Sequence, residues 1–256
     1  MKAIAVRDLT ISSGQRTLVN SLHWMLSAGE ILGLTGPSGG GKTLTASATL
    51  GLTDLDPGVT GGTLELHDGR AVKRLALHGT PHEVDARLAP LRGVAAVYLP
   101  QDADRCLDPL RTVGAQVRSA ARGGEPEPWL RRAGFAEPEA VLGSHPHELS
   151  GGMARRVAIA MAIARGSAFL LADEPTTGLD PLTADHIART LRALADDGIG
   201  VLWITHDLHR LCVLADRAIV LADGKLEEVM DTTALRTRSP SSPVGRALLD
   251  ATSGPW

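Results

Sequence analysis

One segment of the sequence has the residue types and spacing that bind phosphate. Residues 36–43 read GPSGGGKT and fit the pattern G-x-x-x-x-G-K-[ST] between a strand-like and a helix-like segment. Glycines let successive backbone N–H groups turn inward around phosphate oxygens. Lys42 would reach the β- and γ-phosphates, and the Thr43 hydroxyl would be a ligand of Mg²⁺. We therefore predict a phosphate-binding loop made of Gly36, Pro37, Ser38, Gly39, Gly40, Gly41, Lys42 and Thr43.

A second segment places two carboxylates at the end of an apolar run. The sequence AFLLADEP (168–175) is typical of a buried strand that ends in Asp173 and Glu174. In open α/β sheets ligands bind beyond the carboxyl ends of the strands, so Asp173 would lie beside the phosphate loop and hold Mg²⁺, directly or through water. Glu174 could face the γ-phosphate and polarise an attacking water. Such a pair is often only a solvated strand end, and the phosphate loop upstream favours the catalytic interpretation.

Two further polar residues follow strand-like segments. His206 ends the strand of WITHDL (203–208) and could hydrogen-bond the γ-phosphate, holding the water and the carboxylate in line. Gln101 follows the apolar run Val94–Tyr98 and could reach both the metal and the attacking water. A lone histidine or glutamine at such a place is usually a locally satisfied residue. The combination with the other motifs makes both of them candidate catalytic residues, and Gln101 also a candidate metal ligand.

A second phosphate-type element lies more than a hundred residues after the first. In HELSGGMARR (147–156), Ser150, Gly151 and Gly152 come directly before a helix, whose exposed N–H groups and dipole favour an anion. A domain of this length is about 40 Å across, so the two elements can lie too far apart to share one nucleotide. Asp180 in TTGLD (176–180) could be only a helix N-cap.

The elements that must position these residues alternate along the chain. Strand-like runs alternate with helical patterns, which predicts a mostly parallel sheet covered by helices. The predicted strands are Ile31–Thr35, Val94–Tyr98, Ala168–Ala172, Val201–Thr205 and Ala218–Leu221, and the predicted helices are Lys42–Leu50, Met153–Ala164 and Ala184–Ala195.

Three other regions do not alternate in this way. The strand-like segments Ala3–Leu9, Thr17–Leu26 and Thr63–His67 have no helices between them and predict a small antiparallel sheet. Residues 102–165 predict helices over Leu110–Ala121 and Glu127–Ala133, with loops at 123–128 and 143–146. The Ser- and Pro-rich tail from Arg236 predicts a loosely held segment until a short helix at Val244–Asp250.

Composition excludes several classes of protein. The chain has 256 residues, a net charge of −3 and two cysteines, which argues against a general nucleic-acid binder and a disulfide framework. The segment Met1–Ile11 has no signal-peptide pattern, and no apolar run approaches the roughly 20 residues that span a bilayer. His67, His78, His82, His145 and His147 have no metal-ligand spacing with Cys or acidic residues. We expect a cytoplasmic protein, unless a membrane partner recruits it.

In this order, the phosphate loop, Gln101, LSGGM, Asp173-Glu174 and His206 resemble the ATPase subunits of ABC transporters, over roughly residues 1–230. The resemblance implies a P-loop NTPase (RecA-like) α/β fold with an N-terminal antiparallel β subdomain and an inserted helical subdomain. It implies an ATPase domain over 1–235, with helices at about 102–165, and a short tail over 236–256. ATP and Mg²⁺ would be the cofactors, and ATP hydrolysis the reaction.

The resemblance also implies partners. In this family two chains pack head to tail, so Ser150, Gly151 and Gly152 would bind the ATP held by the partner's phosphate loop. Asp180 would communicate across the same interface, Gln101 would lie in the loop that meets the membrane subunit, and His206 would be the switch histidine. The second ATPase subunit could be the same chain or a paralogue. Integral-membrane permease subunits, and indirectly an extracytoplasmic substrate-binding protein, would complete a complex at the cytoplasmic face of the membrane, without nucleic acid.

Finer motifs resemble the dipeptide, oligopeptide and nickel importer group. HPHELSGGMARRVAIAMAIA, ADEPTTGLD and QDADRCLDPL carry this likeness, and KTLTASATLGL (42–52) is closest to nickel-type members. The cargo would be nickel or another metal, a metal chelate or a small peptide. Two positions depart from the wider family: Ser13 stands where an aromatic usually stacks on adenine, and Met153 where many families have Gln.

Two other functions compete with this interpretation. A soluble ABC ATPase acting on DNA or ribosomes would carry a long coiled-coil insertion or two ATPase halves in one chain, and the sequence shows neither. A P-loop kinase or GTPase switch would leave LSGGM, Gln101 and His206 unexplained. The transporter subunit is therefore the favoured prediction, with the soluble ATPase as the alternative.

Overall fold

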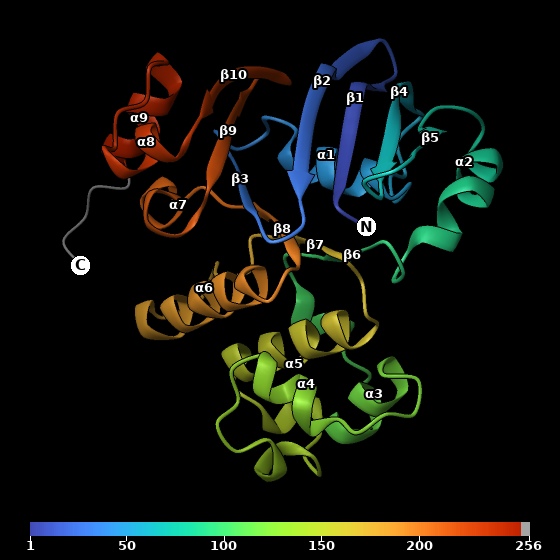
Figure 1. Ribbon diagram of the computed structural model, residues 1–256, viewed down its shortest axis with the longest axis vertical. Helices are drawn as coiled ribbons and strands as arrows, with labels where there is room; N and C mark the ends of the chain where they lie inside the picture. Colours follow the sequence, from blue (N-terminus) through green and yellow to red (C-terminus); the bar gives the residue numbers. More distant parts are fainter. Residues whose placement is uncertain (252–256) are drawn as a thin grey trace.

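The computed structural model of the chain describes residues 1–251, with only the backbone of Asp104, so the end of the predicted tail at 252–256 lies outside the described residues. It contains a central six-stranded sheet, a second four-stranded sheet and a separate group of helices (Figure 1). The predicted α/β class is confirmed.

The central sheet has the strand order β10-β9-β3-β8-β7-β6. All neighbours are parallel except β10, which runs antiparallel to β9. The strands are β3 (Ile31–Thr35), β6 (Ala96–Leu99), β7 (Phe169–Asp173), β8 (Gly200–Ile204), β9 (Arg217–Ala222) and β10 (Lys225–Met230). The predicted parallel strands are confirmed with shifts of one or two residues. Val94 lies in the turn before β6 and is 57% exposed.

Successive residues of the central strands enter two different cores. Leu171 and Leu202 pack on one face of the sheet, whereas Leu170 and Trp203 pack on the other. A strand directs alternate side chains to opposite faces, so a strand covered on both faces reads as a continuous apolar run. This is why the sequence showed the strands clearly without showing which residue faces which layer.

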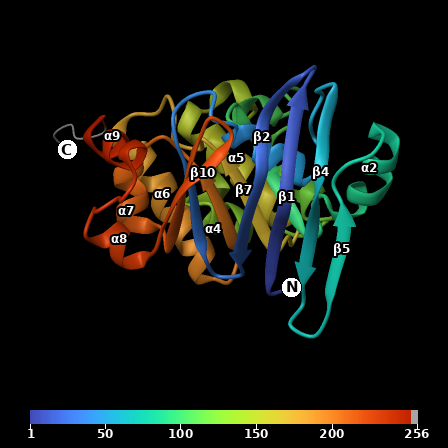
Figure 2. The same cartoon turned by 90° about the horizontal axis from the view of Figure 1, so that it is seen from above.

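The first face is covered by α1 (Lys42–Thr49) and the antiparallel sheet β2-β1-β4-β5. Its strands are β1 (Ala3–Ser13), β2 (Arg16–Ser27), β4 (Pro57–His67) and β5 (Val72–Ala76), and α2 (Pro81–Leu88) with the 3₁₀ turn η1 (Ala89–Leu91) follows at its edge (Figure 2). Trp24 is 5% exposed in this core. The predicted small antiparallel sheet is confirmed.

The second face is covered by α6 (Pro181–Asp196), α7 (Leu208–Leu214) and α8 (Thr232–Arg236). The group of helices beyond them contains α3 (Val113–Ala120), α4 (Glu127–Arg132), α5 (Gly151–Ala164) and the 3₁₀ turns η2 (Ala103–Cys106), η3 (Pro138–Val141) and η4 (Pro146–Glu148). Two predicted helix starts were wrong because of caps. Thr112 accepts a hydrogen bond from the Ala115 N–H, so α3 begins after it, and Asp180 does the same for α6.

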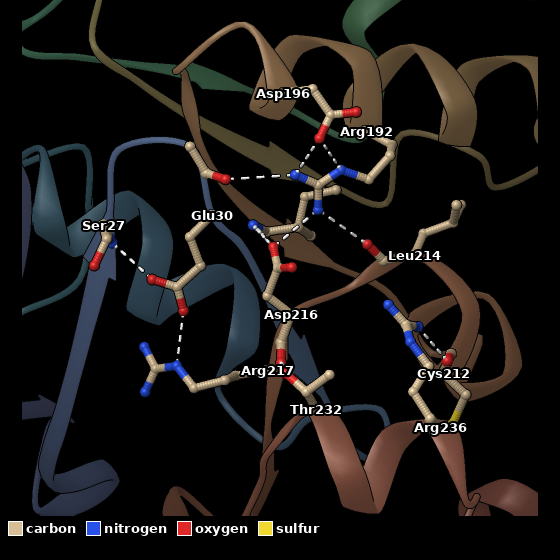
Figure 3. Close-up of polar contacts among 12 residues, drawn as sticks. Ser27, Glu30, Arg192, Asp196, Cys212, Leu214, Asp216, Arg217, Thr232 and Arg236 are labelled. Carbon is tan, nitrogen blue, oxygen red and sulfur yellow. Dashed lines mark hydrogen bonds and ion pairs between the residues drawn. The ribbon is translucent and has the colours of Figure 1, made fainter.

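An ion-pair network closes the amino-terminal end of the parallel strands (Figure 3). The Asp216 Oδ2 atom accepts hydrogen bonds from the Ile31 N–H and from Arg192, both at 2.8 Å. Glu30 accepts from Arg217 at 2.7 Å and from the Ser27 N–H at 2.9 Å. Because these bonds join β2, β3, α6 and β9, they fix the sheet at the end opposite to the predicted site.

The tail is held more firmly than its composition predicts. The buried Glu228 carboxylate accepts hydrogen bonds from the N–H groups of Ser241 and Ser242 at 2.6 and 2.9 Å. The helix α9 (Pro243–Ala251) follows, and its Val244 and Leu248 pack on the core of the second face. The prediction of a loosely held segment was wrong, because its partner on β10 is distant in the sequence.

We expect Glu228→Gln to lower the free energy of unfolding by about 1–3 kcal/mol at pH 7, since hydrogen bonds to charged groups are the stronger ones. Burial alone would raise the pKa of Glu228, but the bonds from Ser241 and Ser242 lower it overall. Because its folded-state pKa is lowered, the Glu228 carboxylate stabilises the fold at pH values above the usual pKa range of glutamate. This stabilisation is lost as the pH falls through the folded-state pKa. Urea unfolding should therefore show a smaller difference in the free energy of unfolding between the wild type and Glu228→Gln at pH 4 than at pH 7. The exposed Glu227→Gln is the control, and an equal effect of both variants would contradict the anchoring role.

Within residues 1–251, none of the helices combines the length and the apolar character needed to cross a bilayer.

Candidate functional site

The phosphate loop joins β3 to α1, as predicted. Gly39 and Gly41 have φ of 78° and 95°, a region that disfavours other residues. A Cβ at Gly36 would lie 1.9 Å from the Leu221 carbonyl oxygen, so only glycine allows this close packing. Helix α1 begins after Gly41 without a side-chain cap, and residues 39–44 line a cavity of 220 Å³. The first backbone N–H groups of α1 are therefore available to an anion.

Lys42 is folded back on this loop. Its Nζ atom donates hydrogen bonds to the carbonyl oxygens of Gly36 and Pro37, at 2.8 and 2.9 Å. Burial lowers the pKa of Lys42 below its usual value, and the nearby carboxylates of Glu174 and Asp173 offset this effect only in part. The structure thus brings together a cation and two carboxylates from β3–α1 and from the end of β7.

Asp173 ends β7 with its side chain buried. The Tyr98 hydroxyl donates to Oδ2 at 2.8 Å, while Oδ1 is buried and has no hydrogen-bond partner among the described residues. Burial raises the pKa of Asp173, an effect that the neighbouring hydroxyls of Thr43 and Tyr98 partly offset. A buried carboxylate oxygen beside a threonine hydroxyl fits a hard divalent cation such as Mg²⁺. Among the side chains that the structure describes, no group of three or more His, Cys, Asp or Glu residues could hold a metal ion.

Glu174 is held by three elements. Its φ of 47° is uncommon for a residue with a side chain, and its N–H donates to the Ile204 carbonyl on β8 at 2.9 Å. His206 Nδ1 lies 3.0 and 3.1 Å from the two carboxylate oxygens, and the Thr177 hydroxyl donates to Oε2 at 2.7 Å. The predicted juxtaposition of Glu174 and His206 is therefore present. Strained backbone of this kind persists where surrounding contacts fix it, often at functional sites.

Gln101 lies after β6 with an exposed side chain. Its carbonyl oxygen accepts a hydrogen bond from Arg155 on α5 at 3.0 Å, and none of the hydrogen bonds among the described side chains involves its amide group. The backbone of this segment is thus anchored, and the role of the amide stays a prediction.

Ser150, Gly151 and Gly152 form the start of α5. The Ser150 hydroxyl accepts from the Met153 N–H at 3.2 Å as an N-cap. A Cβ at Gly152 would lie 2.2 Å from the Thr183 methyl group, whereas one at Gly151 would meet nothing closer than 3.9 Å. Gly152 therefore has a packing reason within the chain. In Figure 1 helix α5 lies in the helical group and α1 between the two sheets, so these phosphate-type elements are separate.

Asp180 accepts a hydrogen bond from the Thr183 N–H at 3.0 Å and caps α6. Contacts from the Thr183 side chain and backbone lower the pKa of Asp180. The capping role that the sequence left open is thus present, and any role at an interface stays a prediction.

The sequence missed three residues of this site. Tyr98 and Thr177 orient the two acidic side chains, and Arg155 joins two loops. Tyr98 had a detectable signal, since it ends the predicted strand Val94–Tyr98, and in the structure it lies on β6, which pairs with the strand of Asp173. Ser13 ends β1 opposite Arg16, and the hairpin residues 13–16 include no aromatic side chain.

A family model described as ABC transporter matches residues 19–177, which include the phosphate loop, Gln101, the Ser150–Gly152 segment and both acids. The chain belongs to the ABC transporter family. This ABC ATPase is 34% identical to the probable peptide ABC transporter ATP-binding protein y4tR of Sinorhizobium fredii, over 96% of the chain and 75% of that protein. It is 33% identical to the nickel import ATP-binding protein NikD of Brucella abortus, over 98% of the chain and 95% of that protein.

A solved structure supports the same fold. The dimeric structure of MJ0796, a bacterial ABC transporter cassette, matches this ABC ATPase with a TM-score of 0.72 and 25% identity, over 90% of this chain and 98% of that one. The predicted fold class, family and ATPase activity are therefore confirmed.

Proposed function

We propose that this ABC ATPase is the ATP-hydrolysing subunit of an importer and that Glu174 polarises the attacking water. The observation that carries this proposal is the carboxylate of Glu174, fixed by His206 and Thr177 beyond the carboxyl end of β7. It belongs to the same group of charges as Lys42 of the phosphate loop. A fixed carboxylate beside a bound triphosphate is what water activation requires.

The other site residues have separate tasks in this proposal. The N–H groups of residues 36–43 and Lys42 bind the phosphates, and His206 holds the carboxylate and the γ-phosphate in line. Thr43, Asp173 and Gln101 would hold Mg²⁺, which neutralises charge on the phosphates when bound. The buried, unpartnered Oδ1 of Asp173 supports this assignment.

We assign ATP to the interface of two head-to-tail ATPase subunits, identical or paralogous. Helix α5, which Ser150 caps, lies apart from α1, which follows the phosphate loop of the same chain (Figure 1), and this separation supports binding to the partner's ATP. The dimeric MJ0796 cassette is consistent with such pairing.

The relatives support a proposal for the cargo and the complex. One is a probable peptide transporter subunit and another a nickel import subunit, so we propose nickel or another metal, a metal chelate or a small peptide as cargo. The chain would lie at the cytoplasmic face of the membrane on permease subunits, served indirectly by an extracytoplasmic binding protein. We assign residues 1–235 to the ATPase domain, with helices at about 102–165, and 236–256 to a tail.

Affinity purification of the full-length chain from solubilised membranes tests this proposal. Permease subunits should co-purify, and the purified complex should hydrolyse ATP. Recovery of nucleic acid or ribosomes in place of membrane subunits would support the alternative, a soluble ABC ATPase.

The segment from Gln101 to Pro109, with α3, is our candidate groove for a short cytoplasmic permease helix. Two adjacent cavities of 180 and 260 Å³ lie here, and both are lined by Cys106, Ala120, Met161 and Arg165. Leu110, which lies in the sequence between the lining residues Asp108 and Arg111, is 87% exposed. Because this segment begins at Gln101, it can shift when phosphate leaves and pass the change to the permease.

We expect Cys106 to cross-link to cysteines placed in the permease's cytoplasmic loops, with a yield that changes on adding ATP. Cys106 is exposed and lies on the rim of both cavities. Mass spectrometry of the cross-linked complex would measure the yield, with a Cys106→Ser chain as the control. Protection mapping that finds residues 101–109 solvent-exposed with and without nucleotide would contradict the groove.

A further inference from the structure

Arg155 is a buried cation on α5 that none of the assigned roles uses. It lies one turn after the Ser150–Gly152 segment, and the residue is 7% exposed. Burying a guanidinium is costly unless hydrogen bonds compensate for the lost water. The contacts that compensate for it therefore show what the residue is built to hold.

The Arg155 guanidinium donates to carbonyl oxygens of two separate loops. Its Nη1 atom donates to Pro175 at 3.2 Å and to Thr177 at 2.9 Å, in the turn that follows Glu174. Its Nη2 atom donates to Gln101 at 3.0 Å, in the segment that follows β6. A planar guanidinium can hold two loops at once, which a lysine ammonium on a flexible stem does poorly.

The turn that Arg155 holds also fixes the Glu174 side chain. The carbonyl oxygen of Thr177 is bound by Arg155, and its hydroxyl donates to Glu174 Oε2 at 2.7 Å. A chain of two contacts thus runs from α5 to the Glu174 carboxylate. A displacement of the turn by loss of Arg155 would move the Thr177 hydroxyl and let the carboxylate rotate.

We propose that Arg155 is a positioning residue for ATP hydrolysis, which fixes the Glu174 carboxylate through Thr177 and ties it to α5 and the Gln101 segment. This inference rests on the proposed function of Glu174. Arg155 thereby joins the start of α5, the Gln101 segment and the Glu174 turn into one rigid unit. Movement of α5 then changes the aim of the carboxylate without any contact between α5 and the nucleotide of the same chain.

The test compares ATP turnover by the full-length chain carrying Arg155→Met, Arg155→Lys or Arg192→Met. The control residue Arg192 is also a largely buried arginine that holds backbone carbonyls, those of Gly29 and Leu214, at the opposite end of the sheet. Arg155→Met should lower kcat roughly ten- to hundredfold, as expected from losing charge-assisted hydrogen bonds, with the KM for ATP within about twofold. The kcat of Arg155→Lys should lie between those of Arg155→Met and the wild type. Arg192→Met should lose thermal stability but keep kcat at a temperature where circular dichroism shows it folded.

A double-mutant cycle with Thr177→Val separates positioning from general structure. If Arg155 acts through Thr177, the loss caused by Arg155→Met should shrink to a few-fold in the Thr177→Val chain, since interacting residues are not additive. The proposal is overturned if the kcat losses of Arg155→Met and Thr177→Val simply multiply in the double variant. It is also overturned if Arg155→Met and Arg155→Lys both have the same kcat as Arg192→Met. If Glu174→Gln is inactive while Arg155→Met stays active, only this inference fails, whereas an active Glu174→Gln chain removes the proposed function itself.

Discussion

Glu174→Gln should reduce ATP turnover by roughly 10²–10⁴-fold, the range that a positioned general base contributes. The amide keeps the size of the side chain and can still contact His206 and Thr177, but it cannot polarise water. ATP binding should persist, because the phosphate loop and Lys42 are unchanged. We also expect the variant to remain as an ATP-bound dimer, which light scattering after gel filtration in ATP and Mg²⁺ would measure alongside phosphate release.

The exposed Glu137→Gln in the helical group is the control, and it should keep wild-type turnover. Turnover close to wild type in the Glu174→Gln chain would place the catalytic role elsewhere, with His206 as the next candidate. Loss of ATP binding in this variant would indicate that Glu174 has a structural function.

Lys42→Ala should weaken ATP binding by roughly 10–100-fold, because charge-assisted hydrogen bonds contribute about 1.5–3 kcal/mol. The phosphates would lose the one side-chain cation of their loop, and turnover would fall with occupancy. The variant also leaves Asp173 and Glu174 without the cation that lies near them. Isothermal titration with ATP and Mg²⁺ would measure the affinity.

The exposed Lys73→Ala on β5 serves as the matched control for the loss of one positive charge. An unchanged ATP affinity in the Lys42→Ala chain would show that the glycine-rich loop is not the phosphate site. Thermal unfolding of the ATP-free variant is needed as well, since Lys42 Nζ also bridges two carbonyl oxygens of the loop.

The sequence predicted most of the elements that carry chemistry, because the central parallel strands β3, β7 and β8 are apolar on both faces. It missed elements whose pattern is mixed. The strand β10 lies at the edge of the sheet and reads KLEEVM, and β5 reads VKRLA, so neither shows a clear period. The first helical turn of α6 was also missed, since Pro181 and Thr183 resemble loop residues, although the sequence indicated Asp180 as a possible N-cap.

Within the site, the motifs gave the acidic residues and the histidine but not the contacts that aim them. Arg155 bonds to residues at positions 101, 175 and 177, and the anchoring of the tail by Glu228 spans β10 and 241–242. Such contacts depend on how layers pack, and no spacing within one segment encodes them. Tyr98 is intermediate, because the neighbouring strands could be inferred although the hydroxyl's partner could not.

The hydrogen bonds from Lys42 to the carbonyl oxygens of Gly36 and Pro37 have a consequence for the affinity for ATP. The ammonium acts as an internal brace, because it joins two carbonyl oxygens of a glycine-rich loop whose backbone could otherwise adopt many conformations. The conformational entropy of the loop is then lost during folding and not during binding. ATP would meet a preorganised loop, and more of the interaction free energy would remain for the closing of two subunits that we propose.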